Sequence, residues 1–239
     1  MQHSVQTNAS SAAPVGVIAH LGRAEESLRV AVLLSVAGGF LDAFTWIAHH
    51  GVMANAQTAN VVLLAVYAAM GQWEEALRRV PSIAAFLAAV LLICRLRAGA
   101  SEESKYHLAM VVLVIEGLVL IVVMSLHVRL PEVAGTLGIS FAAAMQTASF
   151  VKVEGRSYSS VMVTGNLRYS VETFFAGYIE KHDPAALRQS RVLVIVCVTF
   201  ALGAALGAVL TKTIGSRALL VPIALLFVVL ILCTRNRVR

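Results

Sequence analysis

The sequence predicts an all-α fold: a polytopic α-helical membrane protein of six to eight transmembrane segments in two sequence-related halves, some of them broken or re-entrant. The composition is one reason, because 59% of the 239 residues are hydrophobic and only 13% are charged, against about 25% charged in soluble domains. The mean hydropathy is +0.81. Long apolar runs are the second reason, since roughly 20 apolar residues cross a bilayer core of about 30 Å. A repeated polar motif is the third.

Eight apolar segments can be distinguished along the chain. The first, Leu28–Ala48, has 21 residues, enough for a helix of about 31 Å. The second, fifth and sixth are weaker: the second is short, and the sixth carries Arg168 and Glu172. The second segment, the sixth or both could form a broken or re-entrant helix, in which case the chain would cross the membrane fully six or seven times. The segments cover about 28–48, 56–71, 80–97, 106–127, 133–151, 160–178, 191–211 and 216–234.

Residues 1–27 are polar and rich in Ser, Ala and Gln. They lack the basic start, short apolar core and cleavage site of a signal peptide, and we expect a disordered cytoplasmic tail. Residues 28–235 form one integral membrane domain, with repeat halves at about 28–127 and 133–234.

Two related polar motifs support the repeat. In the first half, Asp42 is followed by Thr58-Ala59-Asn60, and in the second half Gln146 is followed by Thr164-Gly165-Asn166. The spacings are similar: 18 residues from Asp42 to Asn60 and 20 from Gln146 to Asn166. Repeated halves in a membrane protein indicate transport. Four crossings per half would give both halves the same orientation, whereas one re-entrant segment per half would give inverted repeats.

Positive charge favours both termini in the cytoplasm. With eight crossings and the N-terminus inside, the inner regions hold eleven Lys and Arg residues and the outer loops seven, the bias of cytoplasmic loops. The net charge of +6 is therefore a feature of topology and does not indicate nucleic-acid binding. Anionic lipid headgroups are compatible partners.

Two carboxyl groups lie inside apolar segments. A carboxylate in hydrocarbon costs about 2.5–3.5 kcal/mol on insertion scales and needs a partner or water. Asp42 is one candidate proton or cation site; the alternative is a structural carboxylate bonded to the second motif or capping a helix break. Glu116, at the centre of the fourth segment, is either a proton carrier or a protonated packing residue.

The motif residues are the candidate substrate or ion site. Thr58, Asn60, Thr164 and Asn166 suit a helix start or break, and Gly165 permits a close backbone approach. Paired half-helix starts would offer backbone N–H groups to an anion or carbonyls to a cation; polar packing between helices is the alternative.

Arg168 completes the candidate set, because it follows Thr164 by one helical turn. Either it faces the cavity, or it pairs with Glu172 four residues on.

Other features argue against catalysis. The three cysteines have no CxxC spacing, which excludes a zinc or disulfide framework, and His49-His50 suits an exposed loop. No nucleophile motif, P-loop or dinucleotide fingerprint occurs. We therefore expect neither an enzyme nor a metal or cofactor. Gly203-x-x-x-Gly207 favours close helix packing, within the chain or between subunits of a homo-oligomer.

At these motifs the chain resembles the YoaK family of bacterial membrane proteins, a domain-of-unknown-function family. The matching pieces are Gly39-Phe40-Leu41-Asp42-Ala43, the Thr-x-Asn motif at 58–60, Met145-Gln146 and Thr164-Gly165, over roughly 30–235. The resemblance implies a bacterial inner-membrane protein of six to eight helices. In this family the first motif usually reads Thr-Gly-Asn, whereas this chain has Ala59 in place of the glycine. If that glycine gives a left-handed turn or a close ligand approach, Ala59 alters the first half-site.

These observations favour a secondary transporter or permease for a small solute, proton-coupled through Asp42 or Glu116, with the site between the halves. The alternative is a structural or partner-binding membrane protein that does not transport.

Overall fold

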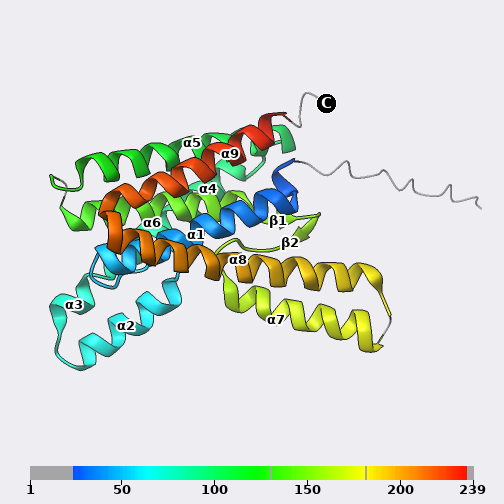
Figure 1. Ribbon diagram of the computed structural model, residues 1–239, viewed down its shortest axis with the longest axis horizontal. Coiled ribbons are helices and arrows are strands. Elements are labelled where there is room, and N and C mark those ends of the chain that lie inside the picture. Colours follow the sequence, from blue (N-terminus) through cyan, green and yellow to red (C-terminus); the bar gives the residue numbers. More distant parts are fainter. Residues whose placement is uncertain (1–23, 130, 181, 236–239) are drawn as a thin grey trace, which may run out of the picture.

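The computed structural model describes residues 24–129, 131–180 and 182–235 and is almost wholly α-helical (Figure 1), which confirms the all-α expectation. A short antiparallel hairpin pairs Lys152–Val153 (β1) with Arg156–Ser157 (β2). The helices follow in the order η1 (Ala24–Glu26), α1 (Leu28–Ala48), α2 (Gln57–Ala69), α3 (Trp73–Leu77), α4 (Val80–Arg97), α5 (Glu102–Leu126), α6 (Glu132–Ser149), α7 (Val163–Phe174), η2 (Phe175–Glu180), α8 (Pro184–Ile214), η3 (Gly215–Leu219) and α9 (Leu220–Arg235).

Four helical stretches of the described chain are long and apolar enough to cross a membrane: Leu28–Ala48, Trp73–Arg97, Glu102–Leu126 and Pro184–Arg235. The last holds both α8 and α9, separated by the short η3 helix. Helix α2, Gln57–Ala69, is apolar but shorter.

Only the last residues of the expected tail, 24–27, are described. Residues 1–23 lie outside the described residues. Ala24–Glu26 form a 3₁₀ turn, and the Ser27 hydroxyl accepts the backbone N–H of Val30 at 3.4 Å, which caps α1. The described structure therefore includes a short helical turn just before α1.

The closest helix pair is α1 with α8. A Cβ added to Gly203 would lie 2.2 Å from the carbonyl oxygen of Val36, and one added to Gly207 would lie 2.7 Å from that of Phe40. Small residues let the two backbones approach in this way. Because later residues of α1 face later residues of α8, the two helices run in the same direction. The expected close packing at Gly203 and Gly207 thus occurs within the chain.

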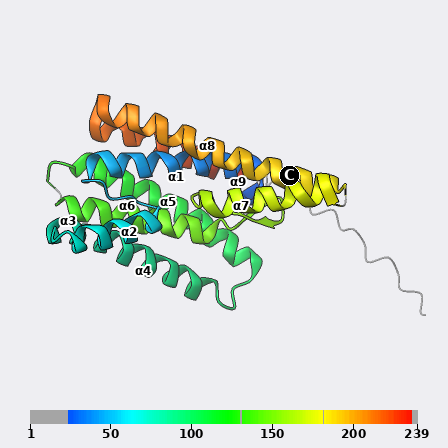
Figure 2. The same ribbon diagram turned by 90° about the horizontal axis from the view of Figure 1, so that it is seen from below.

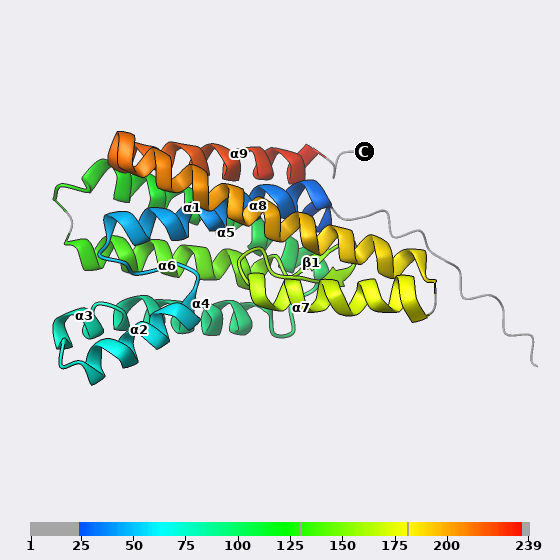
Figure 3. The same cartoon turned by 60° about the horizontal axis from the view of Figure 1, so that its bottom comes forward.

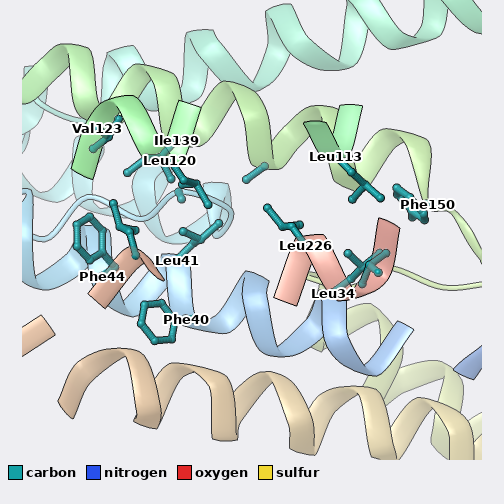
Figure 4. Close-up of a cluster of buried hydrophobic side chains, with 14 of the residues drawn as sticks. Leu34, Phe40, Leu41, Phe44, Leu113, Leu120, Val123, Ile139, Phe150 and Leu226 are labelled. Carbon is teal, nitrogen blue, oxygen red and sulfur yellow. The ribbon is translucent and has the colours of Figure 1, made fainter. Parts of the chain in front are cut away.

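The apolar core lies on the other side of α1, against α5, α6 and α9. Figure 4 shows Leu41 and Phe44 of α1 beside Leu120 and Val123 of α5 and Ile139 of α6. All five side chains are buried. This packing fixes α1 between α8 on one side and the remaining long helices on the other.

The contacts also set the helix directions. The Ser82 hydroxyl of α4 lies 2.8 Å from that of Ser140 in α6, and Arg97 at the end of α4 reaches the carbonyl of Ser149 at the end of α6 at 2.9 Å. Helices α4 and α6 are therefore parallel. Tyr106 at the start of α5 donates to the carbonyl of Cys233 near the end of α9 at 3.1 Å, so these two are antiparallel.

Helices α5 and α6 are antiparallel. A Cβ on Gly138 of α6 would meet Val119 of α5, whereas Gln146, later in α6, contacts Glu116, earlier in α5. In consequence α1, α5 and α8 point toward one end of the bundle, and α4, α6 and α9 point toward the other (Figure 3).

Two short helices leave this bundle from its middle. Helix α2 lies beside α4 and α7 beside α8, and they extend toward opposite ends (Figures 2 and 3). Each is antiparallel to its neighbour. The Tyr67 ring of α2 stacks 4.6 Å from the guanidinium of Arg79, just before α4, and Gly177 in η2 packs against Leu187 of α8. These are the second and sixth apolar segments, where the sequence predicted a break.

Candidate functional site

A cavity of about 750 Å³ lies where the two short helices begin. Its wall includes Thr58 at the start of α2 and Thr164 and Gly165 at the start of α7, together with Asp42 of α1. The chain thus brings residues more than a hundred positions apart to one chamber. Its other walls are largely apolar and aromatic, and they include Trp46, Met53, Phe86, Val161, Met162, Phe200 and Ala204.

Asp42 is held by the loop that leads into α2. Its Oδ1 accepts the backbone N–H of Asn55 at 2.6 Å, and the amides of Ala54 and Ala56 also turn toward the carboxylate. Thr45, one turn later, accepts the N–H of Ala54 at 3.0 Å. The side chain is buried. The carboxylate therefore organises the loop and at the same time forms part of the cavity wall.

Asn55, in the same loop, has an unsatisfied hydrogen-bond acceptor. Its Nδ2 donates to the carbonyl of Gly38 at 3.2 Å, whereas its buried Oδ1 has no hydrogen-bond partner among the described residues. Buried polar atoms are nearly always paired, so this unpaired acceptor distinguishes the loop beside the cavity.

Asn60 fixes the loop from the other side. Its Oδ1 accepts the N–H of Met53 at 3.0 Å, and its Nδ2 donates to the carbonyl of Met53 at 2.7 Å. The amide group therefore pairs with both backbone groups of the residue seven positions earlier. Ser82 of α4 adds a contact to Nδ2 at 3.3 Å.

Asn166 repeats this arrangement. Its Oδ1 accepts the N–H of Ser159 at 3.3 Å, and its Nδ2 donates to the Ser159 carbonyl at 2.6 Å. The separation is again seven residues, so Asn60 and Asn166 make the same bidentate contact at corresponding positions. The sequence predicted that both residues sit at a helix start, but their role is to hold the preceding loop.

The two short helices begin without a side-chain cap. The residues that precede the first turns are Ala56 and Met162, and neither supplies a cap hydrogen bond. The first N–H groups of a helix have no partner inside it, and aligned peptide dipoles place about half a positive charge there. Two such ends and the Asp42 carboxylate face one cavity.

Gly165 has an ordinary helical conformation. Its φ is not positive, and a Cβ at this position would meet no atom within 4 Å. The idea that the motif glycine supplies a left-handed turn is therefore wrong for this half, and Ala59 in the first motif costs the backbone nothing. What Gly165 adds is open space beside the cavity.

Glu116 and Gln146 lie elsewhere, in the core between α5 and α6. Gln146 Nε2 donates to Glu116 Oε2 at 2.9 Å, and both side chains are fully or almost fully buried. Neither residue lines the cavity. Glu116 Oε1 has no partner among the described residues.

Arg168 lies outside the chamber. Its side chain is 81% exposed, it pairs with Glu172 at 2.7 Å, and it does not line the cavity. Arg168 shares a helix face with Thr164, but it lies one turn farther along α7, beyond the first turn that lines the chamber. The intrahelical pair, the alternative left open above, is the arrangement that forms.

Sequence reasoning missed Asn55, Gln57 and Thr147, which also line the cavity. Gln57 and Thr147 adjoin the motifs and were within reach of a pattern argument. Asn55 stands in an irregular loop, and no periodicity indicates its direction. Among the described residues, no group of three or more His, Cys, Asp or Glu side chains is placed to hold a metal ion.

Comparison with known families agrees with the resemblance drawn from the motifs. A family model described as "Protein of unknown function (DUF1275)" matches residues 30–232. No curated protein and no solved structure gives a significant match.

Proposed function

Because the chain belongs to the DUF1275 family of proteins of unknown function, we propose a function from the geometry alone: it is a secondary transporter or permease that binds a small solute in the cavity between α2 and α7. The observation that carries the proposal is the meeting of two uncapped helix starts, from opposite directions, on one chamber that Asp42 also lines. Half-helix ends at such a site are a recurrent device of secondary transporters.

The proposal includes an inverted internal repeat. Helices α1, α2, α4 and α5 would correspond to α6, α7, α8 and α9, and each member of the first set runs opposite to its counterpart. The packing supports this pairing: α1 lies against α8 as α6 lies against α4, and α9 lies against α1 as α5 lies against α6. The matching contacts of Asn60 and Asn166 support it at the level of single atoms.

Three long helices and one half-helix per unit give six full crossings. Among the described residues, nine basic side chains then lie at the end where α1 starts: Arg29, Arg95, Arg97, Lys105, Lys152, Arg156, Arg188, Arg191 and Arg235. Five lie at the opposite end: Arg78, Arg79, Arg129, Lys212 and Arg217. The positive-inside bias favours a bacterial inner-membrane protein with both termini in the cytoplasm.

The chamber suits a small solute with polar and apolar parts. Its volume of about 750 Å³ falls within the roughly 300–1,000 Å³ of ligand sites. The carboxylate of Asp42 and the positive ends of two helices approximately offset each other. A proton on Asp42 would leave net positive charge and favour an anion, so proton uptake and solute binding are coupled through this residue. We assign no catalytic step to the chamber.

The test is a thermal-shift screen of the purified protein against small solutes at several pH values. A bound solute at a hundredfold excess over Kd stabilises the folded state by about 2.7 kcal/mol. We expect a pH-dependent shift that Asp42→Asn removes while the variant still folds. Glu172→Gln, an acid-to-amide change on the exposed face of α7, should keep the shift. A normal response in folded Asp42→Asn excludes the assignment of Asp42.

A structural or partner-binding role is the second candidate, because the backbone N–H groups of residues 54–56 already donate hydrogen bonds to the Asp42 carboxylate. In that case Asp42→Asn changes stability or assembly, and a broad solute library gives no shift with the intact protein. Glu116→Gln distinguishes the roles of Asp42 and Glu116, because this variant changes the pH dependence of solute binding only if Glu116 carries the coupled proton.

A further inference from the structure

The two short helices begin at the middle of the membrane-spanning bundle. Asn55, in the loop before α2, donates to the carbonyl of Gly38 at 3.2 Å, and a Cβ added to Gly38 would lie 2.6 Å from Val161, in the loop before α7. Gly38 is the eleventh of the 21 residues of α1, so it lies about 15 Å from either end of that helix. Since a bilayer core is about 30 Å thick, both helix starts lie near its centre; this step rests on the six crossings of the proposed function.

Polar groups at these two starts are exposed on the side of the bundle. Thr58 in the first turn of α2, and Thr164 and Gly165 in the first turn of α7, are all exposed. Their backbone N–H groups have no hydrogen-bond partner in the described part of the chain, whereas the neighbouring N–H groups of Gln57 and Ala59 are bonded within their own loop. The exposed rim of the chamber therefore carries three unpaired backbone donors and two hydroxyl groups.

Hydrocarbon does not tolerate such groups. At membrane depth, irregular backbone and unpaired N–H groups occur where protein buries them or where they line a water-filled cavity. The chamber provides room for water on one side, because Thr58, Thr164 and Gly165 line it. On the exposed side, a polypeptide has to separate these groups, and the water beside them, from the acyl chains. A single copy of the described chain leaves this side of the chamber open.

The outward face of α2 has the character of a helix contact. The side chain that this helix buries is the polar Asn60. Its exposed residues Thr58, Val62, Ala65 and Ala69 follow at intervals of four, three and four, so they lie on one face. Three of these four are small, and small residues allow two helices to approach closely inside a membrane.

The outward face of α7 is self-complementary in charge. The side chain of Arg168 is 81% exposed and that of Glu172 is 50% exposed, and both lie beside the exposed Leu167 and Val171. A two-fold axis brings Arg168 of one copy toward the carboxylate of the other, so the same patch contributes both charges. Such a self-complementary patch is what a symmetric dimer uses, and two-fold dimers are by far the commonest oligomers.

We infer that the chamber is completed by a second copy of this chain, which packs against the outward faces of α2 and α7. Both copies insert into the membrane in the same direction, so the two-fold axis runs along the membrane normal and the two chambers face each other across it. The exposed faces of α5 and α9, on the opposite side of the bundle (Figures 1 and 3), remain in contact with lipid. The partner thereby forms one wall of the solute site.

Cysteine cross-linking in native membranes tests the contact. With the native cysteines replaced by serine, Ala65→Cys on α2 and Val171→Cys on α7 are the reporters. Leu118→Cys on α5 and Phe227→Cys on α9 are exposed controls on the opposite side. A short bismaleimide should convert at least one reporter, and neither control, into a covalent dimer. Dimers of the controls alone, links only to a different protein, or no dimer at all overturn the inference.

A bulky side chain on the outward face of α2 tests the packing. Lipid tolerates such a side chain, whereas a close helix contact does not. Ala65→Trp should lower the fraction of dimer in lipid nanodiscs at least several-fold, as measured by light scattering, and Ala224→Trp, the same change at an exposed alanine of α9, should not. A wild-type monomer in nanodiscs, which is the result if lipid or residues 1–23 cover the chamber, refutes the inference, as do equal dimer fractions for the two variants.

A spin label tests whether the second copy covers the chamber. Met162 lines the chamber beside α7 and is 61% exposed in a single copy. A nitroxide on Met162→Cys should be several-fold less accessible to lipid-dissolved oxygen than the same label in a protein that also carries Ala65→Trp; equal accessibility contradicts the inference. None of these measurements uses a solute, so an unsuccessful solute screen does not affect them. Conversely, a solute response by a monomeric wild type supports the proposed function and rejects the second copy.

Discussion

The contact between α1 and α8 allows a quantitative prediction at Gly203. A Cβ at this position lies 2.2 Å from the carbonyl oxygen of Val36 and 2.8 Å from two more backbone atoms. Ordinary contact begins near 3.4 Å, so Gly203→Ala requires the backbones to separate by about 1.2 Å. A gap of 0.5–1 Å already loses a quarter to a half of each dispersion contact, and overpacking costs typically about 1–3 kcal/mol.

Gly117→Ala on α5 is the matched control, because a Cβ there meets nothing within 4 Å. Alanine in a helix is favoured over glycine by about 1 kcal/mol, so this variant should be at least as stable as the wild type. For a chain of this size each kcal/mol shifts the melting temperature by about 2–4 °C. Both variants share that gain, so Gly203→Ala should melt about 2–12 °C lower than Gly117→Ala in detergent. Equal melting temperatures for Gly203→Ala and Gly117→Ala would refute the close approach of α1 and α8.

Three further predictions concern the loops and the ends of the bundle. Asn60→Ala and Asn166→Ala should each cost about 1–3 kcal/mol, because each leaves two backbone groups unpaired; similar losses in thermal unfolding check their equivalence, and a neutral effect of one denies it. The Glu154 pKa is lowered from 4.5 by hydrogen bonds from its arginine partner, so its stabilisation is complete above pH 4.5 and is lost as pH falls through the lower folded value. Glu154→Gln should therefore lose less stability than wild type on acidification, which melting curves from pH 6 to pH 3 measure; parallel curves contradict the linkage. With the native cysteines replaced by serine, Val128→Cys should react with an impermeant maleimide in intact cells and Ala98→Cys should not; the reverse pattern inverts the orientation.

Much of the fold could be predicted from hydrophobic patterning. The eight apolar segments coincide with helices, and the short second segment and the charged sixth are the two that leave the bundle. Length distinguished the second segment and charge the sixth. The fifth segment, which is also weak in sequence, forms the 18-residue helix α6 within the bundle. The direction of each helix did not follow, since an apolar segment has the same composition in either orientation. Direction came from particular contacts, such as Tyr106 with Cys233 and Arg97 with Ser149.

The candidate site was predicted less completely, for a physical reason. Asp42, Thr58, Thr164 and Gly165 line the chamber, and a polar residue in an apolar segment is a strong signal of such a place. The bidentate contact of an asparagine with a residue seven positions earlier depends on the path of an irregular loop. Helical periodicity gives no information about that path, so Asn60 and Asn166 were identified without their role.

The differences between the proposed halves also bear on function. Under the proposed inverted repeat, Asp42 of the first half corresponds to Gln146 of the second. Asp42 lines the chamber, whereas Gln146 lies in the core and donates to Glu116. Thr58 and Thr164, by contrast, are identical, and both line the chamber. In the proposed repeat the two halves therefore share the threonines of the chamber and differ at its carboxylate. The variant Asp42→Asn tests whether that difference carries solute binding, because it removes the charge that the second half lacks and leaves both threonines in place.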